Sequence, residues 1–177
     1  MQRFFLFFIS LIILSCGNQN DKVEIQKAEE YSLTDHEVIL TNSDHHDYLK
    51  RQFNYLPWNP SKKNIHTVRS AIEKSIEDDQ FSMLKDPVRD YFYDYYYFQY
   101  LPYQNESGEK FIAINAFCKQ HFEDQLALLE IDGEMVDLNL NWTENLIEVF
   151  DGGWCYWQMK VNLDTGEYFD LRFNGEA

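Results

Sequence analysis

Basic residues are scarce in this chain of 177 residues, which carries 15 lysines and arginines against 30 aspartates and glutamates, a net charge of −15. Such a surface repels the phosphates of nucleic acids and of anionic lipids. The chain also has no G-x-S-x-G elbow, no P-loop and no dinucleotide-binding fingerprint. The charge argues against a nucleic-acid partner. Without these motifs, the sequence points to no catalytic class and no cofactor.

Long hydrophobic runs are missing as well. The apolar stretch Phe4–Leu14 is broken only by Ser10, and at about eleven residues it is too short for a bilayer, which needs roughly 20. Arg3 precedes the stretch and a cysteine follows it, so the leader has the parts of a secretory signal peptide. An internal helix is the weaker interpretation, because a stretch with no polar face would need a core around it.

The leader ends in Ile13-Leu14-Ser15-Cys16, which resembles a bacterial lipobox. The resemblance implies that residues 1–15 are removed as a lipoprotein signal peptide and that Cys16 is acylated. Two or more fatty chains hold a protein stably on a membrane. Because Gly17 rather than aspartate follows Cys16, the resemblance further implies the outer membrane of a Gram-negative bacterium.

The mature chain predicts a tether and one domain. Residues 16–34 are polar and charged and predict a flexible tether that reaches about 25 Å. Residues 35–177 suffice for a single domain with a core and are too few for two. Without residues 1–15, where Arg3 is the only charged residue, 14 basic and 30 acidic residues leave a net charge of −16. This charge favours a basic partner, a cation or simply solubility.

Cysteines are few, and lipid on Cys16 leaves only Cys118 and Cys155. The two can form a disulfide in an oxidising compartment, or they can be buried thiols in the core. The sequence leaves both alternatives open.

One segment, residues 61–78, has a clear helical period. Ile65, Val68, Ile72 and Ile76 recur at spacings of three and four and predict one buried face. On the opposite side we expect Arg69 to pair with the glutamate four residues later.

Strand patterns dominate the rest of the chain. Two segments, 91–100 and 110–118, predict a hairpin, and glycine-rich turns separate three further strands at 145–150, 154–163 and 167–173. Residues 120–143 fit either a second hairpin or a short helix followed by a strand. The predicted fold is therefore α+β, with an antiparallel meander of about five strands packed against one main helix.

Alternation also predicts which strand faces are buried. In the strand at 154–163, Trp157, Met159 and Val161 share the expected core face. In the last strand, Phe169, Leu171 and Phe173 are expected to point inward by the same alternation.

Three short pieces of the C-terminal half resemble a group of small, uncharacterised bacterial lipoproteins. The pieces are Phe117-Cys118, Asp151-Gly152-Gly153-Trp154-Cys155-Tyr156 and Asn174-Gly175-Glu176-Ala177, within a similarity that covers about residues 90–177. The group has no established activity, so the resemblance implies only location and single-domain size.

Candidate chemistry is sparse. His36, His45 and His46 are weak candidates for metal ligands, since imidazole binds zinc, yet adjacent residues on a strand point apart. Cys118 lies three residues before His121 and is a weak candidate for a catalytic thiol. An exposed polar loop and a core cysteine are the favoured interpretations, so we assign no metal, cofactor or catalytic residue.

The aromatic run offers a binding surface. If the segment 91–100 is extended, Tyr91, Tyr93, Tyr95 and Tyr97 share one face, and tyrosine suits contact because it combines an apolar ring with a polar tip. The alternative is a covered face of the sheet.

The functional hypothesis that follows is a lipid-anchored, non-enzymatic binding domain of the inhibitor or immunity type, directed at a basic protein. The first alternative is capture of a glycan or small ligand on the tyrosines. The second is a metal- or thiol-dependent enzyme that uses the His45 region or Cys118.

Overall fold

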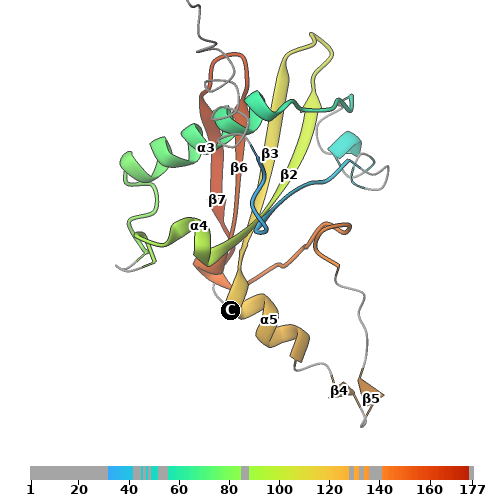
Figure 1. Ribbon diagram of the computed structural model, residues 1–177, viewed down its shortest axis with the longest axis vertical. Helices are drawn as coiled ribbons and strands as arrows, with labels where there is room; N and C mark the ends of the chain where they lie inside the picture. Colours follow the sequence, from blue (N-terminus) through green and yellow to red (C-terminus); the bar gives the residue numbers. More distant parts are fainter. Residues whose placement is uncertain are drawn as a thin grey trace, which may run out of the picture. The chain divides into compact units, whose positions relative to one another are not determined.

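A computed structural model of the chain describes residues 32–41, 45, 47, 49–51, 56–84, 88–127, 130–131, 134–135 and 141–175. The predicted signal peptide at 1–15, the lipid site at Cys16 and most of the tether at 16–34 lie outside these residues. In the part described, the chain has the predicted α+β fold, a five-stranded sheet with one long helix (Figure 1). No helix of this part is long and apolar enough to cross a membrane.

The four longest strands form the predicted antiparallel meander. The sheet order is β1-β2-β3-β6-β7, and β1 pairs parallel to β2, which makes the sheet mixed. The elements follow in this order: β1 (Glu37–Ile39), α3 (Lys62–Glu77), α4 (Phe92–Tyr95), β2 (Tyr96–Gln104), β3 (Lys110–Cys118), α5 (Lys119–Ala127), β4 (Glu130–Ile131), β5 (Glu134–Met135), the 3-10 helix η1 (Gly153–Cys155), β6 (Tyr156–Asn162) and β7 (Tyr168–Phe173).

Helix α3 lies where its period predicts. It begins after Ser61, whose N–H and O–H both donate to the side-chain oxygen of Asn64, at 2.8 and 2.7 Å. On its buried face, Ile65, Val68 and Ile72 are each at most 1 % exposed to solvent. Each such side chain contributes about 1.5–3 kcal/mol of hydrophobic stabilisation, so this face holds the helix on the sheet.

The sheet face toward α3 carries the main core, and Trp157 on β6 lies near its centre. The indole is fully buried, with ring centres 5.1 Å from Phe81 and 5.8 Å from Phe92. Met159 and Val161 are buried on the same face. The predicted core face of this strand is therefore confirmed.

The last strand follows the predicted alternation only in part. Leu171 and Phe173 pack against the core, but Phe169 pairs with Lys160 and is 38 % exposed. The cause is a bulge at Asp170, whose φ is +52°. A bulge inserts one residue and reverses the side-chain alternation beyond it, so the prediction for Phe169 is wrong.

An ion pair joins the parallel strand β1 to α3. Arg69 donates to both carboxylate oxygens of Glu37, from Nε at 2.9 Å and from a terminal guanidinium nitrogen. The Tyr100 hydroxyl at 2.7 Å and the backbone N–H of Thr34 at 2.8 Å complete the contacts of this carboxylate. Burial acts to raise the pKa of Glu37, but these hydrogen bonds outweigh it and lower the pKa. Arg69 thus reaches a strand rather than only its own helix.

The segment between β3 and β6 combines the two alternatives that the sequence left open. Residues Lys119–Ala127 form α5, and a small antiparallel pair, β4 and β5, follows it. The strand predicted at 145–150 is wrong: these residues form neither helix nor strand (Figure 1).

Candidate functional site

The tyrosine-rich segment is extended, as the sequence predicts, only from Tyr96, where β2 begins. Phe92–Tyr95 form one helical turn, closed by the N–H of Tyr95, which donates to the carbonyl of Tyr91 at 3.0 Å. The turn brings the ring of Phe92 to 4.9 Å from the ring of Phe81. Burial of Phe92 therefore overrides the β propensity of this segment.

The predicted shared face of Tyr91, Tyr93, Tyr95 and Tyr97 is consequently wrong. Tyr91 is 62 % exposed, while Tyr93 donates to the backbone carbonyl of Arg69 at 3.2 Å. Burial raises the pKa of Tyr93, which keeps this hydroxyl a donor. The other two tyrosines stack on tryptophans of this chain, with ring centres 5.7 Å apart for Tyr95 and Trp154 and 4.4 Å apart for Tyr97 and Trp142.

His36 lies in a hydrogen-bonded cluster at the end of β3. Its Nε2 atom lies 2.7 Å from the Lys119 ammonium, and its Nδ1 atom lies 3.1 Å from the carbonyl of Tyr93. Lysine can only donate, so Nε2 accepts from Lys119 and the N–H at Nδ1 donates to the carbonyl of Tyr93. Both ring nitrogens are engaged within the protein.

His45 is 6 % exposed, and its Nε2 donates to the carbonyl of Glu144 at 2.8 Å. A nitrogen that donates to a carbonyl carries its proton and is not a metal ligand. His46 lies outside the described residues. Among the residues described, no three His, Cys, Asp or Glu side chains are placed to hold a metal ion.

Cys118 and Cys155 form a disulfide that joins the end of β3 to η1, with Cα atoms 4.9 Å apart. Of the two alternatives that the sequence left open, the structure thus has the disulfide. A bonded Cys118 has no thiolate, so this state offers no cysteine nucleophile.

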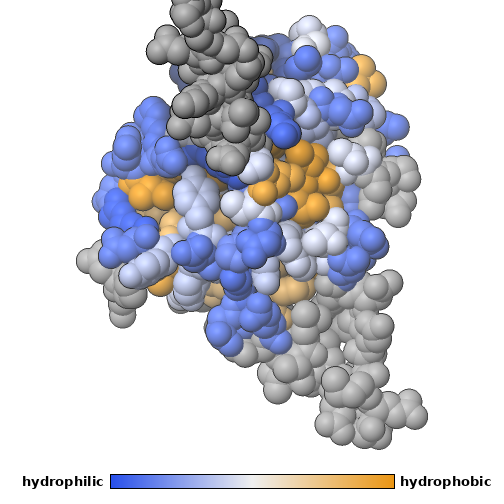
Figure 2. Space-filling model, viewed as in Figure 1, coloured by the Kyte–Doolittle hydropathy of each residue, from blue (hydrophilic) through white to orange (hydrophobic). Residues whose placement is uncertain are grey.

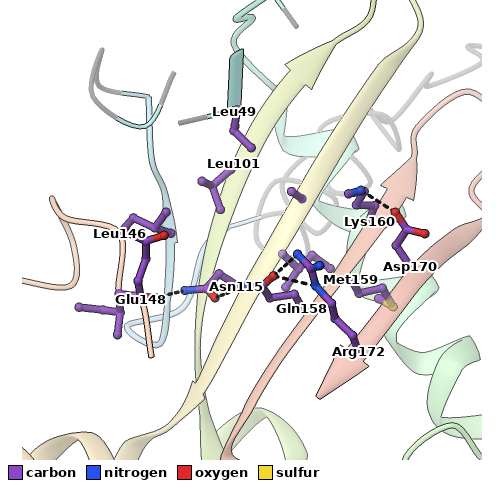
Figure 3. Close-up of a pocket in the computed structure, with 13 residues that line it drawn as sticks. Leu49, Leu101, Asn115, Leu146, Glu148, Gln158, Met159, Lys160, Asp170 and Arg172 are labelled. Carbon is purple, nitrogen blue, oxygen red and sulfur yellow. Dashed lines mark hydrogen bonds and ion pairs between the residues drawn. The ribbon is translucent and has the colours of Figure 1, made fainter. Parts of the chain in front are cut away.

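Four polar residues cross the sheet in one row on the face away from α3. Gln99, Asn115, Gln158 and Arg172 are direct cross-strand neighbours on β2, β3, β6 and β7. Asn115 donates to Gln99 at 2.9 Å, Gln158 donates to Asn115 at 3.3 Å, and Arg172 donates to Gln158 at 2.7 Å. Figure 3 shows Arg172, Gln158 and Asn115 of this row side by side.

A small cavity lies on this row. It has a volume of about 40 Å³, and its apolar lining includes Leu49, Leu101 and Leu146 (Figure 3). Ligand sites usually have about 300–1,000 Å³, so this cavity has room for little more than water. At its edge Lys160 pairs with Asp170 at 2.5 Å. The polar row therefore forms a hydrogen-bonded network that links four strands of the sheet.

The most exposed large apolar side chain described is Phe150, at 95 % exposure. It lies between Ile147, whose carbonyl accepts from Asn115 of the polar row, and η1. Its neighbour Val149 is half-buried and packs against the cluster of Phe117 and Tyr156. The backbone is therefore anchored beside Phe150 while the phenyl ring points into solvent.

Asn174 holds the backbone on both sides of Phe150. The side-chain amide of Asn174 donates to the carbonyl of Val149 and, at 3.2 Å, to the carbonyl of Asp151. Its own N–H donates to the carbonyl of Tyr156 at 2.9 Å, which fixes Asn174 to β6. One side chain from the end of β7 thus brackets the exposed phenylalanine.

Two glycines shape the chain after Phe150. Gly152 has a φ of +93°, and a Cβ there would lie 2.6 Å from the ring of Tyr156. The N–H of Gly153 donates to the carbonyl of Gly175 at 3.1 Å. The disulfide at Cys155 follows directly. We call Glu148–Gly153 the Phe150 loop.

The Phe150 loop is acidic as well as aromatic. Glu148 and Asp151, two residues before Phe150 and one after it, are both exposed. Figure 2 shows one face of the molecule, on which blue, hydrophilic residues surround an orange, hydrophobic patch near the centre and another on the left. An exposed ring between carboxylates suits a basic protein surface better than an anionic membrane.

This loop does not follow from the strand pattern, which places Phe150 at the end of a predicted strand at 145–150. The available signal was a phenylalanine between acidic residues, directly before Asp151-Gly152-Gly153. The bracketing by Asn174 could not be seen, since it depends on a contact 25 residues away.

No protein-family model, no curated protein and no solved structure matches this chain.

Proposed function

We propose that the protein is a lipid-anchored, non-enzymatic binding protein of the cell envelope that presents the Phe150 loop to a basic protein partner. Lipid on Cys16 would hold it on a membrane, and the tether at 16–34 would let the domain reach its partner. Of these parts, the loop is the one within the described residues.

The exposure of Phe150 is the observation that supports this proposal most. Burying a phenylalanine removes about 150–250 Å² of surface from water, so a ring left 95 % exposed forgoes most of that stabilisation. Asn174 meanwhile orders the backbone around it. An ordered, exposed aromatic side chain is typical of an interface anchor.

The charge of the chain supports a basic partner. A net charge of −15 steers association with a basic surface and repels acidic ones. Such steering is screened by salt, with a Debye length of about 8 Å at physiological ionic strength. Association should therefore slow as salt is raised.

Site-specific photo-crosslinking tests the proposal. We would place p-benzoylphenylalanine at position 150 of the full chain in its native cells, with Asp164 on the exposed turn between β6 and β7 as the matched control position. The expected result is a crosslinked protein of basic composition from position 150 and none from position 164. Identical products from both positions, or none from position 150, would contradict it.

A further inference from the structure

We propose that the Phe150 loop is a substrate-like inhibitory loop, and that its partner is a basic endopeptidase with a specificity pocket for aromatic side chains. This inference rests on the function proposed above and names the class of partner.

The bracketing by Asn174 points to a peptidase. A peptidase binds the side chain that precedes the scissile bond in its specificity pocket, and it cuts the peptide bond after that residue. Phe150 would occupy the pocket, and Phe150–Asp151 would be the bond presented. Asn174 donates to the carbonyls of Val149 and Asp151, one on each side of the presented residue. The two carbonyls are therefore held at a fixed separation before any enzyme binds.

The same two hydrogen bonds explain why the loop would inhibit rather than be consumed. In the forward step of a serine peptidase, the serine oxygen bonds to the carbonyl carbon of Phe150 and its proton passes to the peptidase histidine. The bond from that carbon to the nitrogen of Asp151 breaks, its electron pair stays on nitrogen, and nitrogen takes the proton held by the peptidase histidine.

An ordinary substrate then releases its new amine. Here Asn174 retains the carbonyl of Asp151 beside that of Val149, so the amine stays next to the acyl carbon. The nitrogen gives one proton to the peptidase histidine and re-forms the peptide bond, and the serine oxygen leaves and takes that proton, so no other reactant is used.

The supports of the loop are rigid. Asn174 is fixed to β6 by its N–H, and Gly153 is fixed to Gly175. The disulfide between Cys155 and Cys118 prevents the downstream side from moving away from β3. Because the bound conformation is already ordered, little conformational entropy is lost on association.

The flanking charges select the kind of peptidase and argue against a lipid surface. Exposed carboxylates at Glu148 and Asp151 would enter the rim of the cleft with the ring of Phe150. A basic rim offers them partners, whereas an anionic bilayer repels them. The partner is therefore a protein with a phenyl-sized apolar pocket and a basic surround.

Inhibition of two defined peptidases tests the inference. The full mature chain, in detergent micelles, is titrated into chymotrypsin, whose pocket is apolar, and into trypsin, whose pocket holds an aspartate. We expect chymotrypsin to be inhibited and trypsin to be unaffected. Phe150→Ala should weaken inhibition at least about 30-fold, as removal of an interface anchor does. Phe150→Arg should transfer inhibition to trypsin, and a 95 % exposed position leaves the fold unchanged.

Asn174→Ala separates inhibition from binding. Without the bracket, the bond after Phe150 should be cut at least about tenfold faster, because the new amine diffuses away. Mass spectrometry of the two fragments measures the rate.

The two proposals fail in different ways. A chain that crosslinks a partner through position 150 but leaves chymotrypsin uninhibited overturns the inhibitory loop and keeps the binding function. A chain with no crosslink through position 150 overturns the binding function itself.

Discussion

Glu37 and Arg69 form an ion pair 32 residues apart in the chain, and the carboxylate side chain of Glu37 is only 1 % exposed. The pair connects the one parallel strand of the described sheet to the main helix. β1 has three residues, too few to be held by its ladder alone. The ion pair therefore adds a buried contact with α3 to the backbone hydrogen bonds that join this edge strand to β2.

Removing the guanidinium should destabilise the fold more than removing both charges. Arg69→Leu leaves the Glu37 carboxylate buried without its cation, and we expect a loss of about 3 kcal/mol. The double variant Glu37→Gln with Arg69→Leu should recover part of that loss, because no charge is left buried. Urea unfolding of the three proteins measures this, and equal losses in both variants would show that the charge does not matter.

The carboxylate of Glu37 should make the stability of the fold depend on pH. The pKa of Glu37 is lowered in the folded state from its ordinary 4.5, so the folded protein binds this proton less readily than the unfolded chain does. The stabilisation is present above about pH 4.5 and is lost as the pH falls through the lowered value. Thermal unfolding of Glu37→Gln should vary less with pH below 4.5 than that of the unaltered protein. Parallel profiles would refute the assignment.

Loss of the disulfide should weaken the fold substantially. Cys118 and Cys155 are 37 residues apart, and closing a loop of that size restricts the unfolded chain by about 3–4 kcal/mol. We expect Cys118→Ala with Cys155→Ala to lower the free energy of unfolding by about that amount. Reduction of the unaltered protein by dithiothreitol should produce the same shift in a denaturant titration. If dithiothreitol also lowered the free energy of unfolding of the double variant, the shift could not be assigned to the disulfide.

The polar row should be more sensitive to substitution at buried Asn115 than at its half-buried neighbour Gln158. Asn115 is 9 % exposed and donates to Gln99 and to the carbonyl of Ile147. Asn115→Ala removes the donor to the carbonyl of Ile147 and one of the two donors to the Gln99 side-chain oxygen, at a cost of about 1–3 kcal/mol. Gln158→Ala, on the half-buried side of the row, should cost less. Guanidinium unfolding of the two variants compares them, and the reverse order would contradict the role of the network.

Gly152 and Gly108 form a matched pair for testing the Phe150 loop. Both have positive φ, at +93° and +83°, but only at Gly152 does an added Cβ meet a neighbour, the Tyr156 ring at 2.6 Å. Gly108→Ala should cost about 1 kcal/mol for its backbone conformation alone. Gly152→Ala should cost more and should also weaken crosslinking through position 150. Equal losses of unfolding free energy in the two variants would mean that the Tyr156 ring moves away from the new Cβ without strain.

Periodic features of this fold could be predicted from the sequence. The burial of Ile65, Val68 and Ile72 on α3 and of Trp157 on β6 follows from spacing alone. The misassigned residues depend on contacts that spacing does not encode. Phe92 enters the core through a helical turn, and the bulge at Asp170 turns Phe169 to the other face of the sheet. The Phe150 loop is held by Asn174, which lies 25 residues after Val149 in the sequence.

The position of Asn174 in the chain has a consequence for the order of assembly. Asn174 directly follows β7, the last strand of the sheet, so it reaches Val149 and Asp151 only after β7 has docked on β6. During folding, the backbone around Phe150 therefore lacks these two hydrogen bonds until β7 has paired with β6. A chain in which β7 has not docked carries the same phenylalanine on a backbone that Asn174 does not hold.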